Sequence, residues 1–189
     1  MTGLLSTALT GVFALSGVAG PIALADTQNA VAELTYPSYT VSMTAYNAVE
    51  AQTDGDPHTT ASGVFSDPDV VAARSRDLAD ELPFGTVIEI VPAASNKTCG
   101  IELVSEKLGL RVIADSMHSR KRNQIDVLFD TGPVSFGGKR VNPAVVFGIC
   151  KNVEIRVVGR IDIADMPKNQ AELALMLADT KPTELVLAK

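Results

Sequence analysis

Apolar and polar residues alternate along most of the chain between residues 36 and 160. In residues 35–48, three apolar side chains fall on one side (Val41, Met43 and Ala45), and the other side carries Thr40, Ser42, Thr44 and Tyr46. This pattern predicts a half-buried strand. Residues 67–82 predict a strand followed by one helical turn. Further strands are expected within residues 87–91, 101–115, 125–129, 141–150 and 152–163.

Turn-forming residues separate these strands. Long loops are expected over residues 51–63 and 131–139, which are rich in Gly, Asp, Pro, Thr and Ser. Near the C-terminus, Pro167 precedes four apolar residues at helical positions, which predicts an amphipathic helix followed by a loose tail: Leu173, Leu175, Met176 and Leu177. We therefore expect one domain over residues 36–160 and a helical extension over residues 161–189.

The composition favours a small core built from aliphatic side chains. Hydrophobic residues make up 46% of the 189-residue chain, but only 5% are aromatic and none is Trp. At least six short strands, irregular loops and no internal repeat predict a mainly β fold, a small mixed β-barrel with short helices and a C-terminal helix. A β-sandwich is the alternative architecture.

Two aspartates stand out within residues 111–129. Asp115 ends one predicted strand and Asp126 lies near the start of the next, with a basic, polar loop between them. A carboxyl group fixed on a strand beside apolar neighbours can have its pKa raised by desolvation, as a general acid requires. The alternative is a β-hairpin with two solvated aspartates.

The first 25 residues carry no charged side chain, are largely small and apolar, and end in Ala23-Leu24-Ala25. This segment is typical of a signal peptide with an A-x-A cleavage site, although a basic N-terminal region is missing. We expect export to the periplasm or cell envelope, with residues 26–35 as a linker. Contact with a membrane is expected only through an uncleaved N-terminal segment.

Charge is distributed unevenly along the chain. Residues 26–96 hold 11 acidic and two basic residues, whereas residues 97–160 hold 11 basic and six acidic residues. Because no basic patch is interleaved with aromatic residues, a nucleic-acid partner is not expected. The scattered His58, His118, Cys99 and Cys150 do not have the spacing of a metal site, so no metal and no cofactor are expected. In an exported protein, Cys99 and Cys150 can form one disulfide or remain separate thiols.

A resemblance to a known family rests on an ordered set of short motifs: Met43-Thr44-Ala45-Tyr46, Thr60-Ala61-Ser62-Gly63, Ala72-Ala73, Pro83-Phe84-Gly85-Thr86, Ala114-Asp115, Ile125-Asp126-Val127 and Phe147-Gly148. Together they resemble the three-aspartate (3D) domain, which is related to the catalytic domain of membrane-bound lytic murein transglycosylase A. The resemblance covers residues 36–160 and implies a six-stranded double-psi β-barrel.

The family resemblance also implies roles for individual residues. The two active-site aspartates of the family are 11 positions apart, as are Asp115 and Asp126. Asp126 thus matches the catalytic acid and base, and Asp115 matches its supporting carboxylate. The chain departs from the family in two places. Residues 117–122 replace a Gly-Gly-Ala-Ile-Lys-Gly connection, and the third aspartate is absent from residues 72–75.

Two functions follow as hypotheses. The first is an exported, monomeric lytic transglycosylase that cleaves the bond between N-acetylmuramic acid and N-acetylglucosamine in peptidoglycan glycan strands. Tyr46, Thr44, Thr60 and Ser62 are candidates for binding the substrate, because hydroxyl groups and an aromatic face suit sugars. The second is a glycan-binding or wall-loosening module without turnover, since a fold does not fix an activity. In a third reading, the aspartates only brace loops through backbone hydrogen bonds, and turn capping is the alternative role for Thr60 and Ser62.

Overall fold

The computed structural model describes residues 36–53, 55–91 and 99–179 of the chain. The predicted signal peptide (residues 1–25), the linker (26–35) and the tail after residue 179 lie outside these described residues. None of the described helices is long and apolar enough to cross a membrane.

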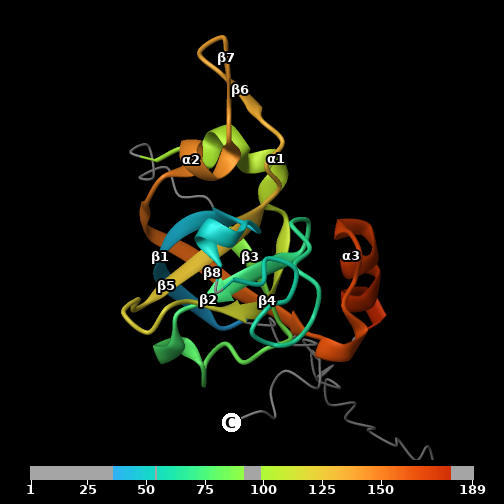
Figure 1. Cartoon of the computed structure of the whole chain (residues 1–189). Coiled ribbons are helices and arrows are strands. Elements are labelled where there is room, and N and C mark those ends of the chain that lie inside the picture. The colour runs from blue at the N-terminus through green and yellow to red at the C-terminus, as the bar shows by residue number, and fades with distance from the viewer. Residues whose placement is uncertain (1–35, 54, 92–98, 180–189) are drawn as a thin grey trace, which may run out of the picture. The chain divides into compact units, whose positions relative to one another are not determined.

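Six strands close into a barrel in the order β1-β5-β2-β4-β3-β8 (Figure 1). They are β1 (Ser38–Asn47), β2 (Val71–Arg74), β3 (Thr86–Val91), β4 (Leu110–Ser116), β5 (Gln124–Phe129) and β8 (Cys150–Arg160). The pairs β1–β5 and β2–β4 are parallel, and the other four pairs are antiparallel. The prediction of a mainly β, closed six-stranded barrel is confirmed, and the alternative of a sandwich is wrong.

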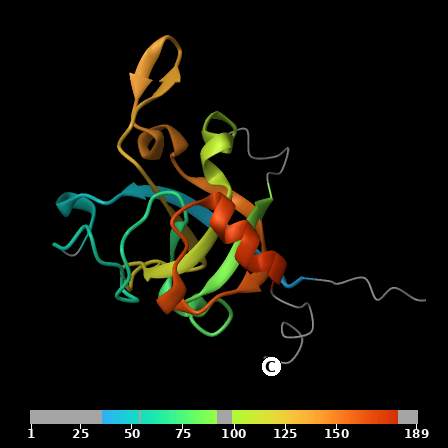
Figure 2. The same cartoon turned by 90° about the vertical axis from the view of Figure 1, so that its right-hand side faces the viewer.

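Short helices and one hairpin complete the described part of the chain. The helical elements are η1 (Glu50–Gln52), η2 (Arg76–Leu78), η3 (Ile101–Val104), α1 (Ser105–Leu108), α2 (Pro143–Phe147), η4 (Ile163–Asp165) and α3 (Gln170–Asp179). Strand β2 followed by η2 confirms the strand and helical turn predicted in residues 67–82, and α3 confirms the C-terminal helix. The hairpin of β6 (Val134–Phe136) and β7 (Lys139–Val141) projects away from the barrel (Figures 1 and 2).

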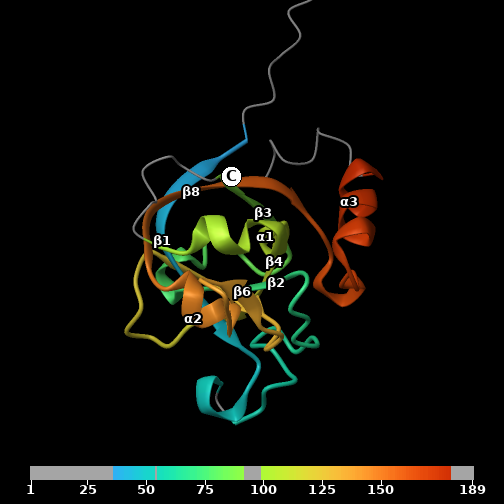
Figure 3. The ribbon, with the colours of Figure 1, turned by 90° about the horizontal axis from the view of Figure 1, so that it is seen from above.

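Two segments in which strands were predicted, residues 141–150 and 101–115, are partly helical, although β4 confirms a strand at the end of the second segment. Residues 143–147 form α2, because the Asn142 side chain accepts a hydrogen bond from the Ala144 backbone and Pro143 occupies the first turn. Residues 101–108 form η3 and α1, so only the end of the segment 101–115 is strand. These helices lie over one end of the barrel (Figure 3), where Ile101, Val104 and Phe147 join the barrel core.

The strands pack different side chains on their two faces. The inner face fills the barrel with aliphatic residues, among them Met43, Ile125 and Val127, which are fully buried. A second cluster covers part of the outer face and includes Tyr46, Ala73, Val112 and Leu128, together with Leu173 of α3. Cys99 and Cys150 form a disulfide with a Cα–Cα distance of 5.3 Å, which ties the segment before η3 to the start of β8.

Candidate active site

Asp115 and Asp126 belong to one row of paired residues across β1, β5, β2 and β4. Thr44 pairs with Asp126, Asp126 pairs with Ala73, and Ala73 pairs with Asp115. Directly paired residues point to the same face of a sheet. The small Ala73 therefore separates two carboxylates that share the outer face. The hairpin alternative is wrong, because β2 lies between β4 and β5.

A β-bulge in β4 brings Asp115 into this row. Ala72 of β2 pairs with Ile113, but the next residue, Ala73, pairs with Asp115, so Ala114 is an extra residue in β4. Strict alternation would have placed Asp115 on the same face as Ile113, inside the barrel. A bulge re-aims the side chains that follow it and is common next to active sites. Here it turns Asp115 towards the face of Asp126.

The Asp115 carboxylate accepts hydrogen bonds from three donors. The Tyr46 hydroxyl donates to Oδ2 at 2.9 Å, and the backbone N–H groups of Ala61 and Ser116 donate to Oδ1 at 2.9 and 2.8 Å. Both oxygens of Asp115 are therefore used as acceptors within the protein. The contact with the N–H of Ala61 also holds the loop that contains Ala61 against β4.

Asp126 has a less polar environment. Its Oδ1 accepts one hydrogen bond, from the Thr44 hydroxyl at 2.8 Å, and Oδ2 has no hydrogen-bond partner among the described residues. The Thr44 hydroxyl oxygen in turn accepts from the Gln124 side chain at 2.7 Å. Because that oxygen already accepts from Gln124, its own proton is directed at Asp126.

Burial raises the pKa of Asp126 to about 6, and the nearby charge of Asp115 acts in the same direction. The hydrogen bond from Thr44 and the positive charge of Lys121 oppose this rise. A carboxyl group with a pKa of about 6 is present in both protonation states near neutral pH. Asp126 can therefore donate a proton and later take one up, which is what general acid and base catalysis requires.

Like Thr44, the other three predicted substrate-binding residues are engaged in contacts within the protein. Burial raises the pKa of Tyr46 well above its ordinary value, so Tyr46 keeps its proton and donates it to Asp115. The hydroxyl groups of Thr60 and Ser62 lie 3.0 Å apart, and Thr60 Oγ1 also donates to the Val64 carbonyl. These contacts favour turn stabilisation as the role of Thr60, and its role in substrate binding stays a prediction.

The segment that lacks the third aspartate also has a clear structure. Arg74 is buried, its Nε donates to the Leu82 carbonyl at 2.7 Å, and its guanidinium stacks over Phe84. Asp77 does not join the carboxylate row: its Oδ2 accepts from the backbone N–H of Asn123 at 2.9 Å. The site thus contains two aspartates, and a third acid near β2 positions the loop before β5.

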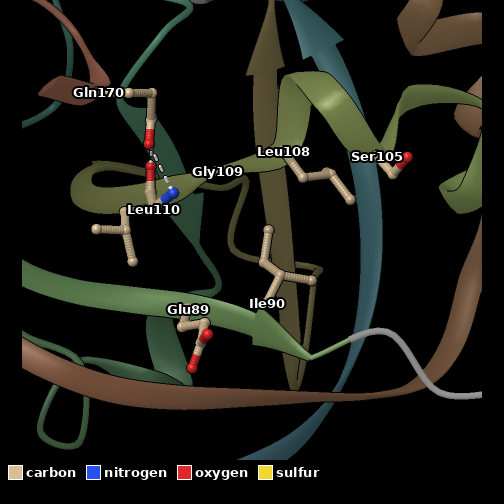
Figure 4. A pocket seen from close by; sticks show the side chains of 7 residues that line it. All are labelled: Glu89, Ile90, Ser105, Leu108, Gly109, Leu110 and Gln170. Atoms are coloured by element: carbon tan, nitrogen blue, oxygen red, sulfur yellow. Dashed lines mark hydrogen bonds between the residues drawn. The ribbon is translucent and has the colours of Figure 1, made fainter. Parts of the chain in front are cut away.

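The structure also contains a hollow of about 310 Å³, whose lining residues are drawn in Figure 4. It is lined by residues of β3, α1 and β4 and by Gln170, whose side chain bonds both the N–H and the carbonyl of Leu110. None of the lining residues belongs to the row of Asp115 and Asp126. Among the described residues, no group of three or more His, Cys, Asp or Glu side chains could hold a metal ion.

Sequence reasoning identified Asp115, Asp126, Thr44 and Tyr46, which the structure brings together on one face. It missed Gln124, although the position of Gln124 two residues before Asp126 on the same strand could have indicated it. It also missed the N–H of Ala61, for which a sequence carries no signal.

Comparison with known proteins does not assign the chain to a family, because no family model and no curated protein matches it.

Proposed function

We propose that this protein is an exported peptidoglycan-cleaving enzyme of the lytic transglycosylase type, and that Asp126 is its general acid and base. The observation that carries this proposal is the contrast within the carboxylate pair. Asp126 is half-buried with a pKa of about 6, and its Oδ2 has no hydrogen-bond partner in the part of the chain that the structure describes. Asp115 beside it accepts from three donors. The resemblance to the 3D domain gives the substrate class.

Lytic cleavage needs one group that works first as an acid and then as a base. Neutral Asp126 would protonate the glycosidic oxygen while the bond from that oxygen to C1 of the muramyl ring breaks. The resulting carboxylate would then take the proton from the muramyl C6 hydroxyl, whose oxygen forms the new bond to C1. The product is a 1,6-anhydromuramyl end, no water is consumed, and Asp126 is neutral again.

Asp115 fits the role of an electrostatic partner in this scheme. Its three donors fix a negative charge on the face where positive charge would develop on the sugar ring. The same charge raises the pKa of Asp126, in addition to the larger effect of burial.

The disulfide between Cys99 and Cys150 supports an extracytoplasmic location, because such bonds persist in oxidising compartments.

The second candidate is a wall-binding module without turnover. It is favoured by the buried Arg74 in the segment where the family has its third aspartate, and by the basic loop at residues 117–122. In that case the two aspartates would bind sugar hydroxyls without transferring a proton.

One assay separates these two functions. The purified protein is incubated with peptidoglycan sacculi, and soluble products are analysed by mass spectrometry for 1,6-anhydromuramyl ends. We expect these ends with the wild type and a fall of about 10² to 10⁴-fold in their rate of formation with Asp126→Asn. Asp165→Asn, at an exposed position in η4, is the matched control and should retain full activity. Binding to sacculi without product from the wild type would reject the enzyme and leave the binding module.

A further inference from the structure

The loop between β4 and β5 concentrates positive charge beside the carboxylate pair. It contains Arg120, Lys121 and Arg122, all exposed, as well as His118. No acidic residue occurs from residue 116 to residue 125, although the whole chain has a net charge of −6. The loop is therefore a local cationic surface on an acidic protein.

Both ends of this loop are fixed to the barrel. At its start, the buried Met117 donates its backbone N–H to the Arg74 carbonyl at 2.9 Å. At its end, Asn123 donates its backbone N–H to Asp77 and its side-chain amide to the Thr40 carbonyl. Asn123 has a φ of 45°, a left-handed conformation that Asn adopts more readily than most residues.

Hydrogen bonds within the loop set its course. The backbone N–H of Lys121 donates to the His118 carbonyl at 2.9 Å, and the Arg122 guanidinium donates to the Ser119 carbonyl at 3.0 Å. Arg122 is thus used to hold the loop together. Lys121 makes no side-chain hydrogen bond or ion pair with any described residue. The charge of Lys121 is therefore exposed, on a loop whose two ends are fixed, where an anion from outside the protein can reach it.

The charge of Lys121 acts directly on the candidate active site. It lowers the pKa of Asp126 from the value that burial would otherwise give. Lys121 lies on the loop that joins the end of β4, just after Asp115, to the start of β5, two residues before Asp126. The side chains of Lys121 and Asp126 form no ion pair in the described structure. A ligand group that binds Lys121 would therefore be a substituent close to the cleaved glycosidic bond, and not one of the atoms of that bond.

We propose that Lys121 forms a cationic subsite that binds the carboxylate carried on O3 of the muramyl ring next to the cleaved bond. This inference rests on the proposed function. In a glycan strand, only the muramyl residue carries an acidic substituent, either the lactyl carboxylate itself or the carboxylates of an attached peptide stem. The substituent is on the ring whose C1 reacts, so it lies one ring's width from the oxygen that Asp126 would protonate. Lys121 would thereby orient the muramyl ring and distinguish it from N-acetylglucosamine.

Binding measurements with three tetrasaccharides of equal length test this subsite. The neutral probe is a chitin oligosaccharide, the second is an amidase-treated glycan with free lactyl carboxylates, and the third carries peptide stems. Dissociation constants are measured by calorimetry with Asp126→Asn protein, so that no probe is consumed. Lys121→Met is then introduced, with Lys121→Arg as the charge-preserving variant. The matched control is Lys139→Met, an exposed lysine in the hairpin that follows the opposite end of β5.

We expect at least one acidic probe to bind about tenfold more tightly than the neutral probe, as one charge-assisted contact would provide. Lys121→Met should remove this preference, whereas Lys121→Arg and Lys139→Met should keep it. Tight binding of the lactyl probe alone identifies the lactyl carboxylate, and tight binding of the stem-bearing probe alone identifies the stem. Tight binding of both shows that the subsite accepts either carboxylate, because the lactyl carboxyl of a stem-bearing residue is an amide. Equal affinities for all three probes, or an equal loss for all three with Lys121→Met, would overturn the subsite. That result leaves the sacculi assay to decide the proposed function separately.

Discussion

The two aspartates of the candidate site are the same residue type, share one face of the barrel and are separated by a single alanine, yet their environments differ. Asp115 follows a bulge and accepts three hydrogen bonds, two of them from backbone N–H groups. Asp126 lies within a regular strand, accepts one hydrogen bond and has a pKa of about 6 because it is buried. The comparison teaches that the number of donors and the degree of burial assign the two roles, and the spacing of the acids does not.

Among the substitutions at the carboxylate pair, Asp115→Ala should have the largest effect on stability. Asp115→Ala leaves the Tyr46 hydroxyl and the N–H groups of Ala61 and Ser116 without their acceptor. We expect a loss of about 1–3 kcal/mol in the free energy of unfolding, measured with urea, because the partly buried donors of Tyr46 and Ser116 lose their acceptor. Hydrogen exchange at Ala61 should also become faster. Unchanged exchange at Ala61 would mean that Asp115 does not hold this loop.

Asp126 should cost stability when it ionises. Its pKa is about 6 in the folded chain and 3.8 in the absence of the fold, so the folded state binds the proton more tightly. Stability is therefore lost as the pH rises from about 4 through 6, and Asp126→Asn should relieve this penalty. We expect the variant to be more stable than the wild type by about 1–2 kcal/mol at pH 8, after allowance for partial exposure, and equally stable at pH 4. A variant less stable than the wild type at pH 8 would contradict this assignment.

The smallest expected effects are shifts of the pH–rate profile, and substitutions at two neighbours of Asp126 should shift it in opposite directions. The hydrogen bond from Thr44 lowers the pKa of Asp126, and the charge of Asp115 raises it. Thr44→Val should therefore move the basic limb of the pH–rate profile to higher pH, while Asp115→Asn should move it to lower pH. Shifts in the same direction for both variants would show that this limb does not report on Asp126.

Much of the barrel could be predicted because its strands follow simple alternation. Residues 40–46 and 125–129 place their apolar side chains inside, as the pattern requires. The pattern failed at residues 143–147, where the cap at Asn142 and the turn at Pro143 outweigh a run of β-branched residues. Local start signals of this kind are visible in the sequence, but they compete with an apolar pattern that fits a strand equally well.

Of the two aspartates in the candidate site, the sequence could predict the orientation of Asp126 but not that of Asp115. Asp126 follows the alternation of β5, so its face could be inferred from Ile125 and Val127. The face of Asp115 could not, because the extra residue Ala114 in β4 reverses what alternation predicts. A bulge depends on pairing with a distant strand, here β2, and this pairing is a tertiary property. The same holds for the N–H of Ala61, which reaches Asp115 from 54 residues away.

The central claim is that burial raises the pKa of Asp126 to about 6, so that this carboxyl group is present in both protonation states near neutral pH. Carbon-13 NMR of the aspartate side-chain carboxyls tests it most directly, with the Asp126 resonance assigned from its loss in Asp126→Asn. The account predicts that this resonance titrates at about pH 6 in the wild type and at lower pH in Asp115→Asn. Titration of Asp126 near 3.8 in the wild type, the ordinary value for an aspartate, would contradict the account.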